Sequence, residues 1–163
     1  MILAALALLA QAEPEGPPIA PQVASEGFRS ICVRHVEDPA ALRAAIRRSP
    51  LGFTRAGTQG PFEIYRAARA TIRFAPGTGC AFDTNLASRA DGVRAIDLVS
   101  EASGTSTPPG AVNHPGTGAL YRWREPVAGS RTGLTASLDW GFLGAPDPRP
   151  VSLSLWAYLR SAR

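Results

Sequence analysis

The sequence contains no lysine, and all 17 of its basic residues are arginines. This absence excludes catalysis by a lysine base or a lysine Schiff base. The chain also lacks the Gly-x-Ser-x-Gly, P-loop, Gly-x-Gly-x-x-Gly and His-Glu-x-x-His motifs, which mark several common enzyme and nucleotide-binding classes. We therefore predict no cofactor, and we expect a protein that is not an enzyme.

The basic residues are scattered rather than gathered on one segment. Seventeen arginines against 13 acids give a formal net charge of +4, and the longest basic cluster is Arg47-Arg48. Nucleic-acid binding usually needs a concentrated basic face with interleaved aromatic residues. The pattern therefore does not indicate a nucleic-acid partner. It does predict a weak attraction to anionic envelope surfaces.

Long apolar runs are also missing, apart from a short one at the start of the chain. The run from Ile2 to Ala10 is well below the roughly 20 residues of a membrane-spanning helix, so no transmembrane segment is predicted. Ala10-Gln11-Ala12 matches a signal-peptidase site, although no arginine precedes the run. We predict a signal peptide over 1–12 and a periplasmic or secreted protein. An ordinary helix is disfavoured by the prolines at 14, 17 and 18.

Two cysteines remain to be explained in a chain expected to be exported. In an oxidising compartment they predict a Cys32–Cys80 disulfide, worth about 4 kcal/mol for a loop of this length. Alternatively, Cys32 and His35 share a helix face and form half of a zinc site or a thiol–imidazole pair. A zinc site would need Cys80 and His114 to converge, which their spacing does not indicate, so no metal is predicted.

Hydrophobic periodicity predicts helices first and strands later. After a flexible Pro/Glu/Gly lead-in over 13–20, a helix from Pro21 presents an apolar face that includes His35, which we interpret as a half-buried histidine. Asp38-Pro39 begins a second helix, and a capping box at Ser88 begins a third that ends at Gly104. Strand-like alternation appears between the second and third helices in the stretches "PFEIYRA", "ATIRFA" and "CAFDTNL".

The last 45 residues or so carry the clearest alternation. "ALYRWREP", "RTGLTASLDWGFL" and "PVSLSLWAYLR" predict a three-stranded antiparallel meander, and the stretch 105–118 before it is expected to be a loop. We thus predict one α+β domain over 21–163. It has two N-terminal helices, central strands, a third helix and the meander, with the helices on one face of the sheet.

The other face of that sheet provides the strongest functional indication. Trp156 and Tyr158 alternate with apolar residues and should face solvent near Arg160. Exposed aromatic rings beside an arginine suit recognition of a sugar, a peptide or a partner protein. Alternatively, a loop, the lead-in or the curl of the sheet covers them. For an enzyme, the best candidates are His114 in the loop and a sheet carboxylate, Asp139.

In layout, the chain resembles small uncharacterised two-cysteine proteins exported by GC-rich bacteria. The features that carry the resemblance are the short signal, a cysteine in the helical "FRSICVRHV" and a second in "GCAF", followed by a helix and a "YRW…LSL" strand set. The resemblance implies export but no activity and no functional residue. We expect an exported, non-catalytic binding domain for a protein or small ligand, with a small periplasmic enzyme as the alternative.

Overall fold

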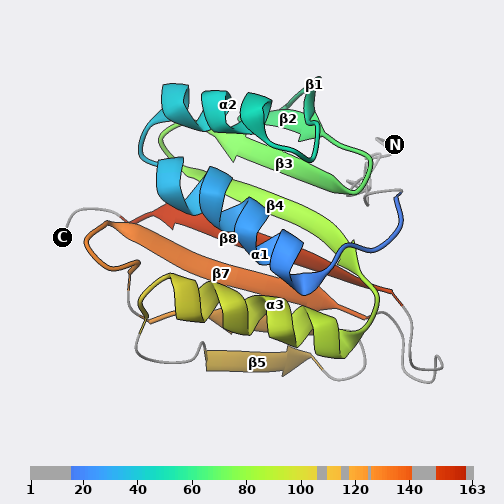
Figure 1. Ribbon diagram of the computed structural model, residues 1–163. Helices are drawn as coiled ribbons and strands as arrows, with labels where there is room; N and C mark the ends of the chain where they lie inside the picture. Colours follow the sequence, from blue (N-terminus) through green and yellow to red (C-terminus); the bar gives the residue numbers. More distant parts are fainter. Residues whose placement is uncertain (1–15, 106–109, 115–117, 125, 141–149, 161–163) are drawn as a thin grey trace, which may run out of the picture.

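The computed structural model describes residues 16–105, 110–114, 118–124, 126–140 and 150–160. These residues form a layer of helices packed on one face of a single curved sheet. Figure 1 shows α1 (Pro21–Phe28) and α3 (Arg89–Ala102) side by side over the sheet. Among these residues, no helix is long and apolar enough to cross a membrane.

Each helix begins where its sequence supplies a start signal. Asp38 caps α2 by accepting hydrogen bonds from the amides of Ala40 and Ala41, and Ser88 caps α3 by accepting from the amide of Asp91. Gly104, at φ +65°, follows the end of α3 in the left-handed conformation that glycine tolerates. The helical elements are α1 (Pro21–Phe28), its π-helical continuation η1 (Arg29–Val33), α2 (Pro39–Arg48) and α3 (Arg89–Ala102).

Eight strands form one antiparallel sheet in the order β1-β2-β3-β4-β8-β7-β6-β5. Two meanders, one before α3 and one after it, meet where β4 pairs with β8. The strands are β1 (Thr54–Gln59), β2 (Phe62–Arg66), β3 (Ala70–Ala75), β4 (Gly79–Leu86), β5 (Gly110–His114), β6 (Gly118–Arg122), β7 (Thr132–Asp139) and β8 (Val151–Leu159).

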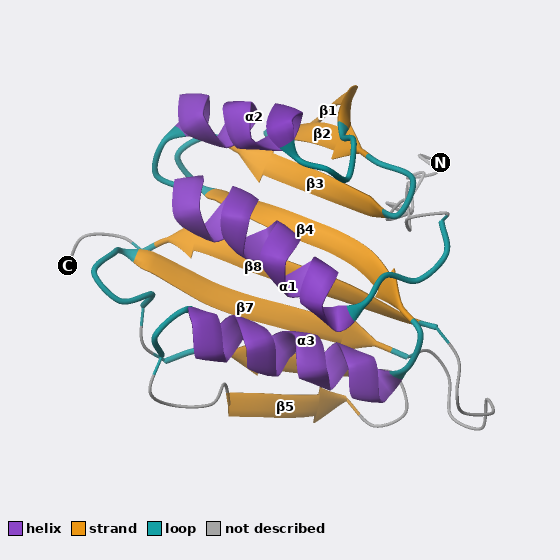
Figure 2. Ribbon diagram, viewed as in Figure 1, coloured by secondary structure: helices purple, strands orange, loops and turns teal. Residues whose placement is uncertain are grey.

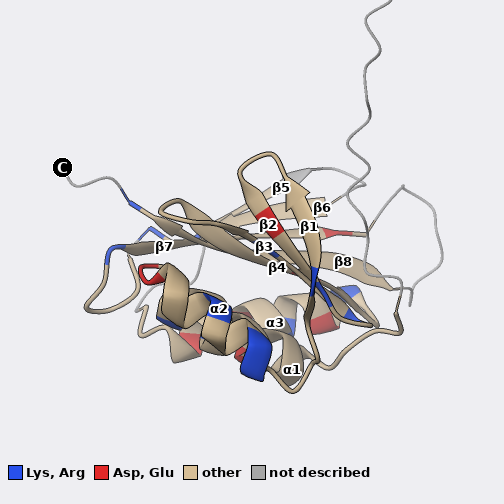
Figure 3. Ribbon diagram, turned by 90° about the horizontal axis from the view of Figure 1, so that it is seen from above, with Lys and Arg blue, Asp and Glu red and all other residues tan. Residues whose placement is uncertain are grey.

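The core lies between the helices and the sheet. Figure 2 shows the helices in front of the strands, and Figure 3, seen from above, shows that they lie on one side of the sheet. Alternate residues of the central strands point into this layer, among them the fully buried Phe82 and Leu155. Trp123 is also buried, and its indole nitrogen donates to Ser100 Oγ on α3 at 2.9 Å. Tyr121 and Trp123 alternate with Arg122 and Arg124, and the sequence does not indicate which pair faces inward. In the structure the aromatic pair faces the core.

The predicted α+β class is confirmed, whereas the predicted layout is only partly correct. The stretch 105–118 was expected to be a loop, but residues 110–114 form β5, so the C-terminal meander has four strands instead of three. β1 was not predicted at all. All its residues are exposed, and β5 consists mostly of small residues, so neither edge strand shows apolar alternation. Each forms because it pairs with a neighbouring strand.

The lead-in differs from its prediction where the structure describes it. Residues 13–20 were expected to have little to pack against, but the side chain of Ile19 is 3% exposed and belongs to the core. Its amide donates to the carbonyl of Asn85 on β4 at 3.0 Å. The predicted signal peptide and cleavage site, residues 1–12, lie outside the described residues.

The predicted disulfide is present between Cys32 in η1 and Cys80 on β4, with a Cα–Cα distance of 5.3 Å. It joins the helix layer to the centre of the sheet, and both cysteines are fully buried. Because both sulfurs are in this bond, the thiol–imidazole and zinc interpretations of Cys32 and Cys80 are excluded. His35 is half-buried, as predicted, and burial together with Arg34 and Arg48 lowers its pKa.

Candidate functional site

Strand alternation divides the sheet into two faces. We call the side packed against the helices the covered face and the opposite side the open face; among the described residues, no helix lies on the open face. The candidate site lies on β4, β8 and β7, at the middle of the open face. Residues directly opposite each other on neighbouring strands share a face, so the register places the open-face residues of these strands in four rows.

The first two rows each carry an aromatic residue of β8 between small neighbours. Tyr158 lies between Gly79 and Gly133, and Trp156 lies between Ala81 and Thr135. A Cβ at Gly133 would collide with the Tyr158 ring, 2.7 Å from its Oη, so this ring lies across the glycine. Small neighbours therefore give the rings room to lie over the sheet. We call these two rows the aromatic half of the open face.

Trp156 is held by side chains from β2 and β3. The Arg73 guanidinium lies 5.0 Å from the centre of the Trp156 ring, across Ala81 in the same row. Phe62 meets the ring edge-on, with 5.8 Å between ring centres. Ala81 is fully buried although it points to the open face, because these larger side chains cover it. Trp156 and Tyr158 are both half-buried.

The other two rows carry only hydrogen-bonding side chains. One row is Asp83, Ser154 and Ser137, and the next is Asn85, Ser152 and Asp139. We call these two rows the polar half. Within it, the Ser152 hydroxyl donates to Asn85 Oδ1 at 3.1 Å and the Ser154 hydroxyl to Asp83 Oδ1 at 2.6 Å.

An ion pair connects the two halves. Arg73 donates to both carboxylate oxygens of Asp83, from Nε at 2.6 Å and from Nη2 at 2.9 Å, and Nη2 also lies 3.3 Å from Ser154 Oγ. Both charged side chains are largely shielded, with exposed fractions of 26% and 16%. Because their opposite charges cancel, this part of the open face has little net charge.

Arg160, the third residue of the predicted binding face, has a structural role. Its Nη2 donates to the backbone carbonyls of Trp123 and Arg124, at 3.3 and 2.8 Å. This guanidinium therefore ties the end of β8 to the segment after β6. The structure thus groups Trp156 with Arg73 and Asp83, which the sequence does not indicate for the binding face, and places Tyr158 in the neighbouring row.

The two residues of the enzyme alternative lie in one row of the sheet. His114 on β5 pairs with Gly118 on β6, and Gly118 pairs with Asp139 on β7. Since neighbouring strands lie about 4.8 Å apart, the backbones of His114 and Asp139 are roughly 10 Å apart. This row extends the polar-half row of Asn85, Ser152 and Asp139 onto β6 and β5.

A second cluster of charged residues connects α2 to β2 on the covered face. Arg43 Nε donates to both oxygens of Glu63, and the Tyr65 hydroxyl donates to Glu63 Oε2 at 2.6 Å. The bond from Arg43 lowers the pKa of Glu63 to about 2. Burial and the bond to Glu63 raise the pKa of Tyr65. Because every group in this cluster has a partner, we assign it to fixing α2.

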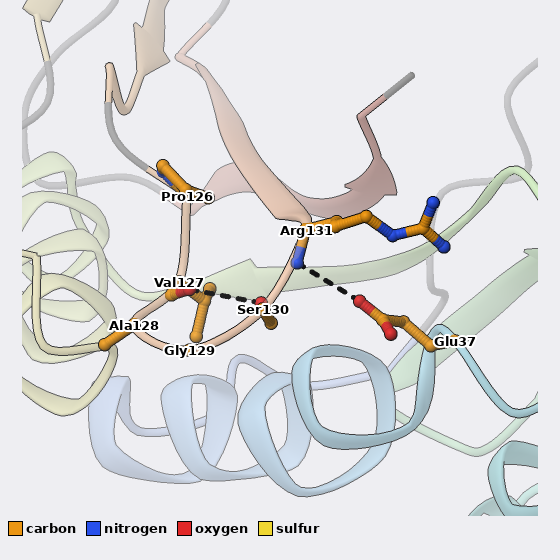
Figure 4. A pocket seen from close by; sticks show the side chains of 7 residues that line it. All are labelled: Glu37, Pro126, Val127, Ala128, Gly129, Ser130 and Arg131. Atoms are coloured by element: carbon orange, nitrogen blue, oxygen red, sulfur yellow. Dashed lines mark hydrogen bonds between the residues drawn. The ribbon is translucent and has the colours of Figure 1, made fainter. Parts of the chain in front are cut away.

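A shallow depression of about 400 Å³ lies between Glu37 and the turn over residues 126–131. Figure 4 shows that Glu37 accepts a hydrogen bond from the Arg131 amide and that the Ser130 hydroxyl donates to the Val127 carbonyl. These contacts stabilise the turn, and the polar groups do not converge on a common point. Among the described residues, no group of three or more His, Cys, Asp or Glu side chains could hold a metal ion.

Comparison with known proteins provides no relative: no family model, curated protein or solved structure matches this chain.

Proposed function

We propose that this protein is an exported binding domain and that its ligand lies on the open face, over β4, β8 and β7. One observation carries the proposal: on the face that the helices leave uncovered, four half-buried side chains form a series of contacts. Phe62 contacts Trp156, Trp156 contacts Arg73, and Arg73 forms an ion pair with Asp83. Burial of the core does not require them there, because the core lies on the covered face.

The chemistry of the site suits binding without catalysis. Trp, Tyr and Arg are the residue types that contribute most to binding energy at recognition surfaces. The guanidinium of Arg73 and the carboxylate of Asp83 are held in a two-point ion pair, which fixes the rings beside them. A preorganised surface of this kind loses little side-chain freedom when a ligand binds.

Export supports the proposal from a different direction. The Cys32–Cys80 bond is of the kind that persists in oxidising compartments, and the N-terminal sequence carries the features of a signal peptide. We therefore place the ligand in the periplasm or outside the cell. Localisation is tested by the intact mass of the exported protein, which should start at Glu13 and take up an alkylating reagent only after reduction.

Hydroxyl-radical footprinting tests the location of the ligand. The mature protein is oxidised alone and with the cell-envelope fraction of the source organism, and oxidation is read residue by residue by mass spectrometry. We expect strong protection of Trp156 and Tyr158. Trp140 is the matched control, because it is also half-buried but lies beside Arg89 of α3, 4.1 Å from ring centre to guanidinium carbon. Protection confined to Trp140 or to the helices would refute the proposal.

A small enzyme that uses His114 with Asp139 is the second candidate. The shared row of these residues favours it, since it continues the polar half of the open face. In a screen of hydrolase substrates, any activity should be lost in His114→Ala and Asp139→Asn. Activity that survives in His114→Ala would exclude this mechanism.

A further inference from the structure

We propose that the ligand of the open face is a glycan, a hydroxyl-rich oligosaccharide or polysaccharide that lies along β8. The inference rests on the proposed function and deepens it by naming the class of ligand. It follows from the positions of side chains along β8. Ser152 and Ser154 occupy one end of its open face, and Trp156 and Tyr158 occupy the other end.

The aromatic half matches the apolar side of a sugar ring. The C–H groups of a pyranose form an apolar patch that packs on an aromatic face, and aromatic rings provide large apolar area at low conformational cost. The Tyr158 ring lies across Gly133, and the Trp156 ring has Ala81 and Thr135 as its row neighbours. The Tyr158 ring therefore lies beside small residues that do not project above it. The Trp156 ring already contacts Arg73 and Phe62, and a sugar would pack on the part of this ring that stays exposed.

The polar half matches the hydroxyl groups of a sugar. Its two rows hold three serine hydroxyls, one amide and two carboxylates, so donors and acceptors are present on all three strands. Hydroxyl groups both donate and accept, and each serine, amide or carboxylate group can take part in more than one hydrogen bond. The hydrogen bonds from Ser152 to Asn85 and from Ser154 to Asp83 fix the orientation of these groups on the open face.

The charge and dimensions of the site favour a neutral chain over a protein. The Arg73–Asp83 pair cancels its own charge at the junction of the two halves. Protein interfaces usually have a central apolar core and a polar rim, whereas here the apolar and polar groups occupy opposite ends of one strip. Six residue steps separate Ser152 from Tyr158, which corresponds to about 20 Å of extended strand. A strip of this length and narrow width suits an extended chain of sugar rings.

The test repeats the footprinting with chemically treated envelope fractions. Periodate opens sugar rings that carry vicinal diols, lysozyme hydrolyses the diol-free amino-sugar backbone of peptidoglycan, and a protease removes protein partners. Each treatment is applied to a separate portion of the envelope fraction. The control is a fraction that receives periodate already quenched with glycerol. We expect periodate or lysozyme to abolish the protection of Trp156 and Tyr158, and protease treatment to leave it unchanged.

The outcomes separate this inference from the proposed function. Protection that survives both periodate and lysozyme overturns the glycan, while the open face remains the binding site. Absence of protection with the untreated fraction overturns both. Binding to the untreated fraction by Tyr158→Ala should be about tenfold weaker than wild type. Tyr158→Phe, which keeps the ring and folds with the same packing, should bind nearly as well, and equal losses in the two variants would refute ring stacking.

Discussion

Along β8, Leu153, Leu155 and Ala157 point to the helices, whereas Ser154 and Trp156 point to the open face. These three covered-face residues are apolar and fully buried. Another apolar side chain of similar volume would fill the same space in the core. The open-face residues make directed contacts instead: an ion pair, a ring stacked under a guanidinium and hydroxyls that donate to a carboxylate and an amide.

The difference shows which side chains the fold needs and which it does not. Burial of apolar area accounts for the composition of the covered face. Burial of apolar area does not account for Arg73, Asp83 and Trp156. On an open face, any polar side chains solvated by water would serve the fold as well as these three residues. The arrangement of the open face is therefore where function should be sought, and four measurements can break or sharpen the comparison.

The largest effect should come from the covalent link between the helix layer and the sheet. A Cys32→Ala/Cys80→Ala variant should lose about 4 kcal/mol in free energy of unfolding, because its unfolded chain is no longer cross-linked over 48 residues. Chemical denaturation of the oxidised protein and the variant measures the loss. Ser137→Ala, an exposed change on the open face, is the control and should stay within about 0.5 kcal/mol. A loss below about 1 kcal/mol in the double variant would contradict the prediction.

Two aromatic truncations compare the faces directly. Phe82→Ala should cost about 3–5 kcal/mol, because Phe82 is fully buried on the covered face and packs edge-on against Phe53. Trp156→Ala should cost less than half as much, since part of the Trp156 ring stays in water in the folded protein. Urea denaturation gives both values. Equal losses would mean that the open face contributes to the core after all.

Two glycines provide a subtler comparison. A Cβ at Gly92 on α3 would press into the buried side chain of Leu138, so Gly92→Ala should destabilise by about 1 kcal/mol after its gain in helix propensity. At Gly133 the clashing group is the Tyr158 ring, which can swing into solvent. Gly133→Ala should therefore leave the free energy of unfolding nearly unchanged but weaken binding to the envelope fraction. Thermal melting and binding to the envelope fraction are measured for both variants. A loss of stability in Gly133→Ala as large as that in Gly92→Ala would contradict this prediction.

A further comparison is the pH dependence of the charged cluster on the covered face. The pKa of Glu63 is about 2 in the folded protein, below its ordinary value of 4.5, because Arg43 bonds to its carboxylate. Its contribution to stability is therefore present above pH 4.5 and is lost as pH falls toward 2. Glu63→Gln should flatten the dependence of unfolding free energy on pH in this range. An unchanged slope in the variant would assign the acid sensitivity to other carboxyl groups.

Local signals in the sequence were sufficient for much of this fold. The side chains of Asp38 and Ser88 begin helices because they accept hydrogen bonds from amides two or three residues away. The alternation in β7 and β8 identified strands and separated their two faces correctly. The disulfide followed from the number of cysteines and the expected compartment. The edge strands β1 and β5 had no such signal, because their residues are exposed or small.

The candidate site was predictable only in part. Trp156 and Tyr158 stood out because a large aromatic residue at a solvent-facing strand position is unusual. Arg73 and Asp83 gave no such signal, since charged residues at outward positions are ordinary in a half-exposed strand. Their roles became visible only when β3, β4 and β8 were placed side by side in register.

The sequence by itself determined where helices begin, which residues of β7 and β8 face the core and which cysteines pair, because these depend on neighbours within a few residues or on composition. Only the tertiary structure decided that β4 pairs with β8, whose residues lie 65 or more positions apart. That pairing sets Asp83 beside Ser154 and brings Trp156 within reach of Arg73. Such contacts depend on long-range register, which the packing of the whole core selects and no local pattern encodes.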